Sequence, residues 1–344
     1  MRAYWFKTLA AAALFYAAIL VVLCWVRTPI PAEYWVREAI VIKRYLAGRI
    51  SSPKIVVLGG SSVLFGVDTA QMEEALHVPA FNLGLHASLP LADVLEEGRR
   101  AARPGDVLVL ALEAHYYSPR PSWSPWQVTN AVAWNPASLD ALSWWRRLEV
   151  FAVAAPPDLW WELLRAGVER KIDSRAHRAA ELALAADSVL IGHYLEGDQR
   201  EENNPYQAWD LDRLGNLPSF RGTRLREGGR SAALPAAIDA EDKELLAGFI
   251  AEMASRRVRV VFAYSPYYIE GTPEEGWGAA EEAFRKSAQE IGGEVIDRRD
   301  QLFFPKDLFY DYRYHLNAEG RALRTRILIE SLRKGGYLPE ALSP

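Results

Sequence analysis

The chain has 344 residues, of which 50% are hydrophobic and 24% are charged, and its formal net charge at pH 7 is −4. This is the composition of a folded protein rather than a disordered one, and the length allows one large hydrophobic core or two modest ones. Because nucleic-acid binding usually needs a basic face, the net charge gives no reason to expect it, and the single cysteine, Cys24, excludes an internal disulfide framework and a cysteine-based metal site.

The first predicted element is an apolar run at residues 8–26, which reads TLAAAALFYAAILVVLCWV and contains no charge and no proline. About 20 apolar residues in a helix cross the hydrocarbon core of a bilayer, so residues 1–28 are expected to form a cytoplasmic tip and a transmembrane anchor. Arg2 and Lys7 precede the run, which favours a body outside the cytoplasmic membrane, although Arg27 follows directly and dilutes this asymmetry.

Two alternatives to an anchor follow from the same run. A cleavable signal peptide would need a small-x-small cleavage site, and none follows the run. A buried core helix is the other alternative, and the length of the run argues against it. We therefore expect a single-pass membrane protein whose body, residues 29–344, is periplasmic or extracellular.

Strands and helices alternate along this body. The predicted helices are 32–46, 69–77, 241–255, 274–291 and 318–334, and the predicted strands are 54–58, 80–83, 106–112, 258–264 and 294–296. Asp239 is the expected N-cap of the helix at 241–255. Such alternation implies a parallel sheet that helices cover on both faces, so the predicted fold class is α/β with three layers, α/β/α.

Residues 119–240 interrupt the alternation. They hold four prolines between 119 and 136, tryptophan pairs at 144–145 and 160–161, a helix-like stretch at 173–187 and a polar stretch at 196–229. We predict a mostly helical insertion between two core strands that caps the functional site. The tryptophan pairs are interpreted as core or membrane-interface residues.

A serine follows the first predicted strand of the body. The strand at 54–58 is followed by Gly59-Gly60-Ser61-Ser62, and open α/β sheets bind their ligands just outside the carboxyl ends of the strands. Glycines allow a tight turn there, and nearby amides can donate to an oxyanion. The same composition is also common in ordinary turns, so this motif alone leaves both interpretations open.

A histidine and an aspartate share one loop before the last predicted helix. Residues 309–317 read FYDYRYHLN and contain Asp311 and His315. Nucleophilic serine catalysis needs a base that takes the hydroxyl proton and a carboxylate that orients this base. A lone histidine among aromatic residues is more often structural, but together with Ser62 it predicts a catalytic pair, with Asp311 as the orienting acid.

These motifs resemble the SGNH hydrolase superfamily, in particular its DltD-like and AlgJ-like branch of cell-envelope proteins, over about residues 29–118 and 241–336. The resemblance implies a flavodoxin-like sheet with the nucleophile at Ser62, within Gly60-Ser61-Ser62. It also implies an oxyanion site made by the amides of Ser62 and Gly84, the latter within Phe81-Asn82-Leu83-Gly84. The last block of the family is matched by HLNAEG, which begins at His315.

The chain departs from that family at two points. The family has its aspartate three residues before the histidine, whereas here Tyr312 holds that position and Asp311 lies four residues before His315. Either the loop carries an extra residue and Asp311 still orients His315, or another carboxylate does so. The block that supplies an oxyanion asparagine is replaced by EAHYY at 113–117, and this branch commonly lacks that asparagine.

Polar and aromatic residues at two predicted strand ends are candidates for substrate binding. Glu113, His115 and Tyr116 follow the strand at 106–112, and Tyr264 ends the strand at 258–264. Aromatic rings stack on sugar faces, so a glycan groove is one interpretation, and packing beneath the insertion is the other. The histidines show no metal-ligand spacing, so no metal site is expected, and the acyl transfer that the resemblance implies needs no cofactor beyond the acyl donor.

The resemblance implies a membrane-anchored, extracytoplasmic serine acyl-transfer enzyme. It would be an O-acetyltransferase or acyl-handling component for a cell-envelope polysaccharide, with an acyl donor, a glycan acceptor and a polytopic membrane acyltransferase as partners. Two alternatives stay open at this point. One is an esterase or deacetylase that uses the same serine chemistry on a glycan or lipid, and the other is a non-catalytic scaffold that binds a glycan or a membrane partner.

Overall fold

The structure is a computed structural model, and it describes residues 2–25, 32–118, 123–140, 142–154, 181–182, 184–197, 199–200, 204, 206–226, 231, 233–235, 237–269 and 276–339. The chain divides into two compact units, the first of Met1–Tyr34 and Ser122–Val189 and the second of Trp35–Pro121 and Leu190–Pro344. All the predicted site residues belong to the second unit. The predicted insertion at 119–240 is therefore not one body, because its part from Leu190 onward belongs with the sheet.

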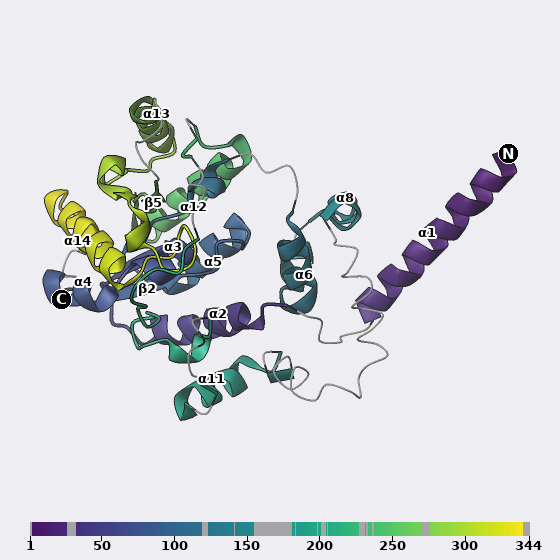
Figure 1. Cartoon of the computed structure of the whole chain (residues 1–344), viewed down its shortest axis with the longest axis horizontal. Coiled ribbons are helices and arrows are strands. Elements are labelled where there is room, and N and C mark those ends of the chain that lie inside the picture. Colours follow the sequence, from purple (N-terminus) through teal and green to yellow (C-terminus); the bar gives the residue numbers. More distant parts are fainter. Residues whose placement is uncertain are drawn as a thin grey trace. The chain divides into compact units, whose positions relative to one another are not determined.

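Four parallel strands form the sheet of the second unit, in the order β2-β1-β3-β4 (Figure 1). They are β1 (Ile55–Gly59), β2 (Ala80–Gly84), β3 (Val107–Leu110) and β4 (Arg259–Phe262). From β1 the chain first forms β2 on one side and then crosses over to form β3 on the other side of β1. The strand order therefore reverses at β1, and open α/β sheets bind ligands in the crevice at the carboxyl end of such a point. In place of the predicted strand at 294–296, one isolated parallel bridge joins Val295 to Phe262.

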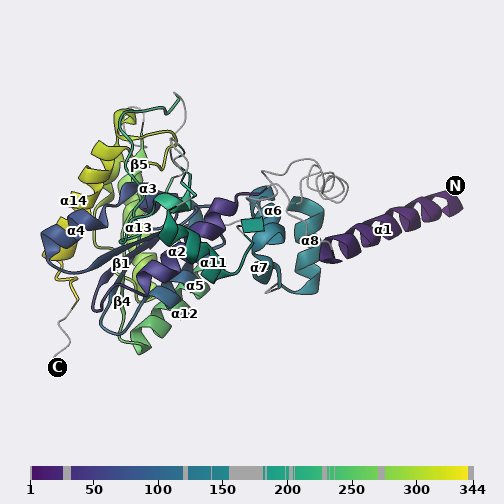
Figure 2. The same ribbon diagram turned by 90° about the horizontal axis from the view of Figure 1, so that it is seen from below.

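Helices cover both faces of the sheet, as the alternation predicts. Ile55 and Val57 of β1 pack on the face that holds α3 (Ser61–Gly66), α4 (Thr69–Leu76) and α14 (Ala318–Lys334). Leu58 points to the opposite face, which holds α5 (Leu91–Ala101) and α12 (Ala240–Ser255), because successive strand residues face opposite sides. Figures 1 and 2 show α4 beside α14 and α5 beside α12. The three-layer α/β/α prediction is confirmed.

The other elements of the second unit are short or peripheral. They are α2 (Tyr34–Ala47), η1 (Ala114–Tyr117), η2 (Ala208–Asp210), β5 (Tyr267–Tyr268), α13 (Trp277–Glu290), η3 (Arg299–Leu302), β6 (Phe303–Phe304) and η4 (Lys306–Leu308). The boundary between the units falls within α11 (Asp187–Glu196). Asp239 caps α12 as predicted, since its Oδ2 accepts a hydrogen bond from the Glu241 amide at 3.2 Å.

The first unit contains α1 (Arg2–Trp25), α6 (Pro125–Trp134), α7 (Pro136–Asp140) and α8 (Trp144–Ala154). Within the described residues, no helix combines the length and the hydropathy that crossing a membrane requires. The predicted span at 8–26 reaches beyond them, because the side chains of 19–25 and all of residue 26 lie outside the description. The tryptophan pair at 160–161 and most of the helix-like stretch at 173–187 also lie outside the described residues.

A buried lysine connects three separate parts of the second unit. Lys43 of α2 is fully buried, and its Nζ donates to the Asn82 carbonyl at 2.7 Å, to Asn82 Oδ1 at 3.3 Å and to the Gly215 carbonyl at 2.8 Å. Burial lowers the pKa of this ammonium group well below its ordinary value, and nearby Asp212 opposes that shift. All three donors of the group have partners, so one side chain holds α2, the edge strand β2 and the segment at Gly215 together.

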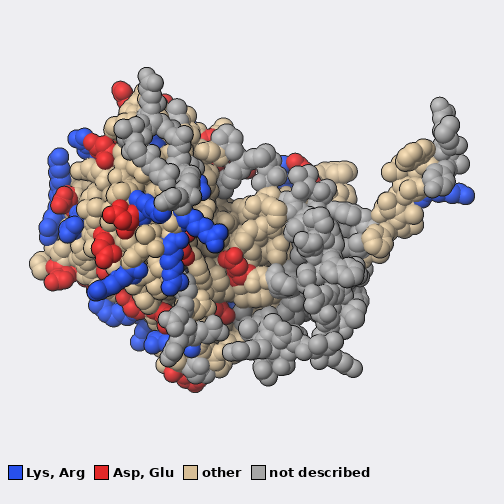
Figure 3. All heavy atoms as spheres, viewed as in Figure 1, with Lys and Arg blue, Asp and Glu red and all other residues tan. Residues whose placement is uncertain are grey.

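The visible surface of the second unit carries both signs of charge. In Figure 3, basic and acidic side chains are interspersed over this face rather than gathered by sign. Such a surface agrees with the small net charge and offers no extended basic patch for a nucleic acid on the side seen.

Candidate functional site

The candidate site lies at the carboxyl ends of the four strands. Ser62 follows β1 in the first turn of α3, Gly84 ends β2, Glu113 follows β3 and Ser265 follows β4. Since the strands are parallel, these four residues meet at one edge of the sheet, which is where α/β folds of this kind bind ligands.

A buried carboxylate fixes the turn that holds Ser62. Glu113 is completely buried, and its Oε1 accepts a hydrogen bond from the Ser62 amide at 2.8 Å while its Oε2 accepts one from the Gly60 amide at 3.2 Å. A Cβ atom at residue 60 would come within 2.4 Å of Glu113 Oε2, so glycine is required there. Glu113 therefore positions the serine.

Two of the predicted substrate-binding residues have other roles. Glu113 and Tyr116 are both completely buried, and the Tyr116 hydroxyl donates to the Leu89 carbonyl at 3.1 Å. This corrects the prediction that they contact a substrate. The physical reason is that β3 ends at Leu110 and the chain then folds into η1, which turns these side chains inward. His115 is half-buried, with its Nε2 at 2.8 Å from the Ala87 carbonyl oxygen.

His315 is oriented by two oxygen atoms. Its Nδ1 lies 2.9 Å from Asp311 Oδ1 and 3.2 Å from the Tyr206 hydroxyl, and the Tyr206 hydroxyl donates to Asp311 Oδ2 at 2.6 Å. The loop makes this possible by a turn in which the His315 amide donates to the Tyr312 carbonyl at 2.9 Å. Of the two alternatives that the irregular spacing left open, the structure has the one in which Asp311 contacts His315.

The same contacts keep Asp311 ionised. Burial by itself would raise the pKa of its carboxyl group, but the hydrogen bonds from His315 and Tyr206 outweigh burial and hold this pKa below its ordinary value. A carboxylate at Nδ1 leaves Nε2 as the basic atom of the imidazole, which is the arrangement a general base requires.

The serine turn and the histidine loop meet. The rings of Phe65 and His315 lie 4.2 Å apart between centroids, and Leu316 packs over Gly66. Phe65 lies three positions after Ser62 in α3, so the two side chains share a face of that helix. Within the described part of the chain, however, no hydrogen bond joins Ser62 to His315, because the Ser62 hydroxyl lies 3.1 Å from Ser265 Oγ instead.

The two predicted oxyanion donors are already engaged. The Ser62 amide donates to Glu113, and the Gly84 amide donates to Asn82 Oδ1 at 2.8 Å. Each amide has one hydrogen, so neither faces the site as a free donor. Gly84 serves packing instead, because a Cβ atom there would lie 2.1 Å from the backbone nitrogen of Leu64.

A second imidazole lies near His315. His86 follows β2, and its Nδ1 accepts a hydrogen bond from the Ser88 amide at 3.2 Å. Burial, and to a smaller extent the proximity of His315, lowers its pKa from the ordinary value of 6.5 to about 4. His86 is therefore neutral at pH 7, with its proton on Nε2.

A shallow hollow adjoins the serine pair. Tyr264 lies in its wall and is 5% exposed, and its hydroxyl has no hydrogen-bond partner among the described residues. Burial raises the pKa of this hydroxyl well above its ordinary value, so it stays protonated. The hollow borders Ser265, and its complete lining is Leu112, Ala114, Leu234, Tyr264, Ser265, Pro266, Tyr267, Arg299 and Tyr314.

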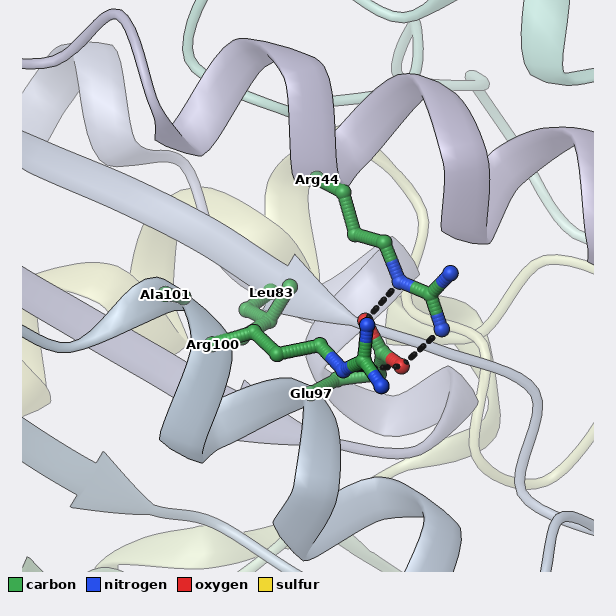
Figure 4. A pocket seen from close by; sticks show the side chains of 5 residues that line it. All are labelled: Arg44, Leu83, Glu97, Arg100 and Ala101. Atoms are coloured by element: carbon green, nitrogen blue, oxygen red, sulfur yellow. Dashed lines mark hydrogen bonds and ion pairs between the residues drawn. The ribbon is translucent and has the colours of Figure 1, made fainter. Parts of the chain in front are cut away.

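A second hollow, of about 210 Å³, lies between α2 and α5 (Figure 4). Arg44 crosses it, with its Nε and Nη2 donating to the two carboxylate oxygens of Glu97 at 2.6 and 2.5 Å, and Leu83, Arg100 and Ala101 complete the wall. No predicted site residue lines this hollow. The bidentate pair connects the two helices, which is a structural role.

Sequence reasoning missed Tyr206, His86 and Ser265 as members of the site. Tyr206 came from a stretch that was expected to be part of the insertion, and no local motif marks it. A role for Ser265 could have been predicted, because it follows a predicted core strand directly. Among the described residues, no three His, Cys, Asp or Glu side chains are grouped so that they could hold a metal ion.

Comparison with known proteins identifies no relative of this chain. No family model, no curated protein and no solved structure matches the chain.

Proposed function

We propose that this chain is a membrane-anchored serine acyl-transfer enzyme that works outside the cytoplasmic membrane. Its role would be that of an O-acetyltransferase or acyl-handling component for a cell-envelope polysaccharide, of the SGNH type. The observation that carries the proposal is the packing of the Asp311–His315 pair against the helix that begins with the Ser62 turn, at the carboxyl edge of the sheet.

The proposed reaction follows from these contacts. Ser62 Oγ attacks the acyl carbonyl carbon, and Nε2 of His315 takes the hydroxyl proton while Asp311 holds Nδ1. The leaving group takes that proton from His315, and a glycan hydroxyl then attacks the acyl-enzyme by the same steps in reverse. A χ1 rotation of Ser62 away from Ser265 and toward His315 precedes the attack, since hydrogen bonds between catalytic groups are often absent without substrate.

The anchor is proposed from the apolar run at 8–26 and from the exposure of α1. Large apolar side chains on this helix are largely exposed, at 64% for Trp5, 75% for Phe6, 67% for Leu9, 72% for Leu14 and 65% for Phe15. Side chains of this kind favour a lipid environment over water. A polytopic membrane acyltransferase that delivers acyl groups across the bilayer would be the matching partner.

A second candidate is the non-catalytic scaffold. Two observations favour it: the Ser62 hydroxyl is paired with Ser265 rather than with His315, and the two expected oxyanion amides are engaged elsewhere. In that case the site would bind a glycan or a membrane partner without turnover.

Covalent labelling of the full chain by a fluorophosphonate tests the proposal. We expect wild-type protein to be labelled at Ser62, with labelling lost in Ser62→Ala and retained in Ser61→Ala, the matched neighbouring serine. Wild-type protein that stays unlabelled, or Ser62→Ala protein that labels equally, would favour the scaffold. With an acetyl ester as donor, free acetate as the sole product would indicate the esterase alternative, and acetylated glycan the transferase.

A further inference from the structure

The proposed acyl transfer leaves one requirement without an assigned group. A tetrahedral intermediate at Ser62 carries a negative oxygen, and its stabilisation by oriented donors is usually the largest contribution to such catalysis. The amides of Ser62 and Gly84, which the motifs suggest for this purpose, donate to Glu113 and Asn82. A different donor is therefore needed near Ser62 Oγ.

We propose that the hydroxyl group of Ser265 is an oxyanion donor of this site, an inference that rests on the proposed function. Ser265 follows β4, and its Oγ lies 3.1 Å from Ser62 Oγ, the attacking atom. Its other contact, to the Ala111 carbonyl, is long at 3.4 Å. When Ser62 Oγ turns toward His315, the position that it leaves lies within hydrogen-bond distance of Ser265 Oγ. A carbonyl oxygen that occupies this position becomes the oxyanion, one bond beyond the carbon that Ser62 attacks, so the Ser265 hydroxyl can donate to it.

The exchange of partners is chemically balanced. As the bond from Ser62 Oγ to the carbonyl carbon forms, the carbonyl π pair moves onto its oxygen, and the serine proton passes to Nε2 of His315. Ser62 Oγ has by then turned away from Ser265 and has given up its hydrogen. The Ser265 hydroxyl keeps its proton and turns its donor to the new oxyanion, and the hydrogen bond is withdrawn when the carbonyl reforms.

The surroundings of Ser265 suit this role. Ser265 borders the shallow hollow beside the serine pair, whose wall is largely aromatic and aliphatic, so a donor there is partly shielded from water. A hydrogen bond to a charged oxygen is stronger in such surroundings than in bulk water. A carbonyl oxygen directed at Ser265 would also direct the substrate toward this hollow.

The test is steady-state kinetics of the full chain with a p-nitrophenyl acetate donor. Removal of one oxyanion donor typically lowers kcat by about 100-fold or more, so we expect a loss of that size in Ser265→Ala with KM nearly unchanged. Ser265→Thr keeps a hydroxyl and should restore most of the rate. Ser331→Ala, which removes a helix-surface hydroxyl bonded to the Ile327 carbonyl, is the control and should react as wild type.

Two further readouts separate this role from a structural one. The pH profile of Ser265→Ala should keep the shape of the wild-type profile, because the hydroxyl does not titrate in that range, and its melting temperature should stay near that of wild type. Affinity for a trifluoromethyl ketone, which forms an oxyanion adduct with the serine, should fall in parallel with kcat/KM.

The outcomes distinguish the two proposals. If wild-type protein neither reacts nor labels, the proposed function fails and this inference fails with it. If wild-type protein reacts and Ser265→Ala reacts within about twofold of it, or Ser265→Thr is as impaired as Ser265→Ala, the enzyme stands and the oxyanion role of Ser265 is wrong.

Discussion

The His315 imidazole is held on one side by Asp311 and Tyr206 and packed on another by the Phe65 ring. Tyr206 satisfies the carboxylate oxygen that does not face the imidazole, so Asp311 has donors at both oxygens. A carboxylate that accepts a hydrogen bond at each oxygen is fixed in place and stays ionised, and an imidazole beside it is held in one tautomer. The geometry of a single side chain thus depends on a tyrosine more than a hundred positions away in the sequence.

Removal of the Tyr206 hydroxyl should shift the acid limb of the pH profile. Tyr206→Phe takes away one hydrogen bond that lowers the pKa of Asp311, so this pKa rises, and the loss of activity that follows protonation of Asp311 as pH falls begins at a higher pH than in wild type. The rate at pH 8 should fall by less than about tenfold, whereas Asp311→Asn should lose about 10³- to 10⁴-fold. Because the wild-type pKa lies below its ordinary value, rate measurements are extended to about pH 2, together with an NMR titration of the Asp311 carboxyl carbon over the same range. Tyr194→Phe removes a hydroxyl bonded to the Leu211 carbonyl, and its profile should match wild type. An unshifted limb in Tyr206→Phe would contradict the assignment.

His86 should make stability depend on pH. Its folded-state pKa of about 4 lies below the ordinary value of 6.5, so unfolding takes up a proton between these two values. The free energy of unfolding therefore keeps its full His86 contribution above about pH 6.5 and loses it progressively as pH falls toward 4. Urea unfolding should therefore show a smaller loss between pH 7 and pH 4.5 in His86→Gln than in wild type. His77→Gln, at an exposed helix end, should keep the wild-type dependence. Equal slopes in all three proteins would refute the assignment.

The short helix α3 is the element that presents the serine, and its start is fixed from outside. Its N-cap residue, Gly60, makes no side-chain cap, and instead Glu113 accepts from the amides of Gly60 and Ser62. A neighbouring strand end thus supplies the capping carboxylate that the local sequence lacks. In this arrangement position 60 has no space for a side chain larger than the hydrogen atom of glycine.

Gly60→Ala should damage this element. The added Cβ would overlap Glu113 and the Ala87 backbone, so we expect a loss of about 2–4 kcal/mol in the free energy of unfolding and loss of fluorophosphonate labelling. Gly248→Ala in α12 is the matched control, because its Cβ would meet no atom within 4 Å. This control should be neutral, or stabilising by up to about 1 kcal/mol. Denaturant unfolding of both variants provides the measurement, and equal stabilities would show that Glu113 moves freely.

The molecule as a whole depends on contacts between segments far apart in the chain. Lys43, Asn82 and Gly215 belong to a helix before the sheet, the edge strand and a loop that follows α11, and one ammonium group joins them. A buried charge of this kind is tolerated only because each of its donors has an oxygen partner.

Lys43→Met should destabilise the whole second unit. The substitution keeps the apolar stem but leaves buried carbonyl oxygens of Asn82 and Gly215 without this donor, which should cost about 2–4 kcal/mol. Lys286→Met, at an exposed position on α13, should change stability by less than about 0.5 kcal/mol. Urea unfolding monitored by tryptophan fluorescence compares the two. Similar midpoints would mean that the buried lysine contributes nothing net.

The proposed membrane attachment can be tested directly with the full chain. We expect the protein to remain with the membrane fraction of a bacterial host after carbonate washing, and to keep its own N-terminus. A soluble product that begins after residue 26 would indicate the cleaved signal peptide instead. Protease added to spheroplasts should digest a C-terminal tag if the body lies outside.

Much of the fold was predictable because its signals are local. The last helix was predicted at its observed bounds, 318–334, and short apolar segments predicted the four strands of the sheet to within three residues at each end. Asp239 capped α12 as its position suggested. The strand–glycine–serine pattern and the aspartate–histidine loop lie in segments that contact each other through Phe65 and His315.

The partners of the site residues were decided by the tertiary structure alone. Ser62 and Ser265 are 203 positions apart, and Tyr206 and Asp311 are 105 apart, so no local pattern could connect them. The same holds for Glu113, which is 51 positions from Ser62 and accepts the amide that the motifs suggested for an oxyanion. A local sequence determines which backbone conformations are favourable, whereas a buried polar group must find its partner wherever the packed chain offers one.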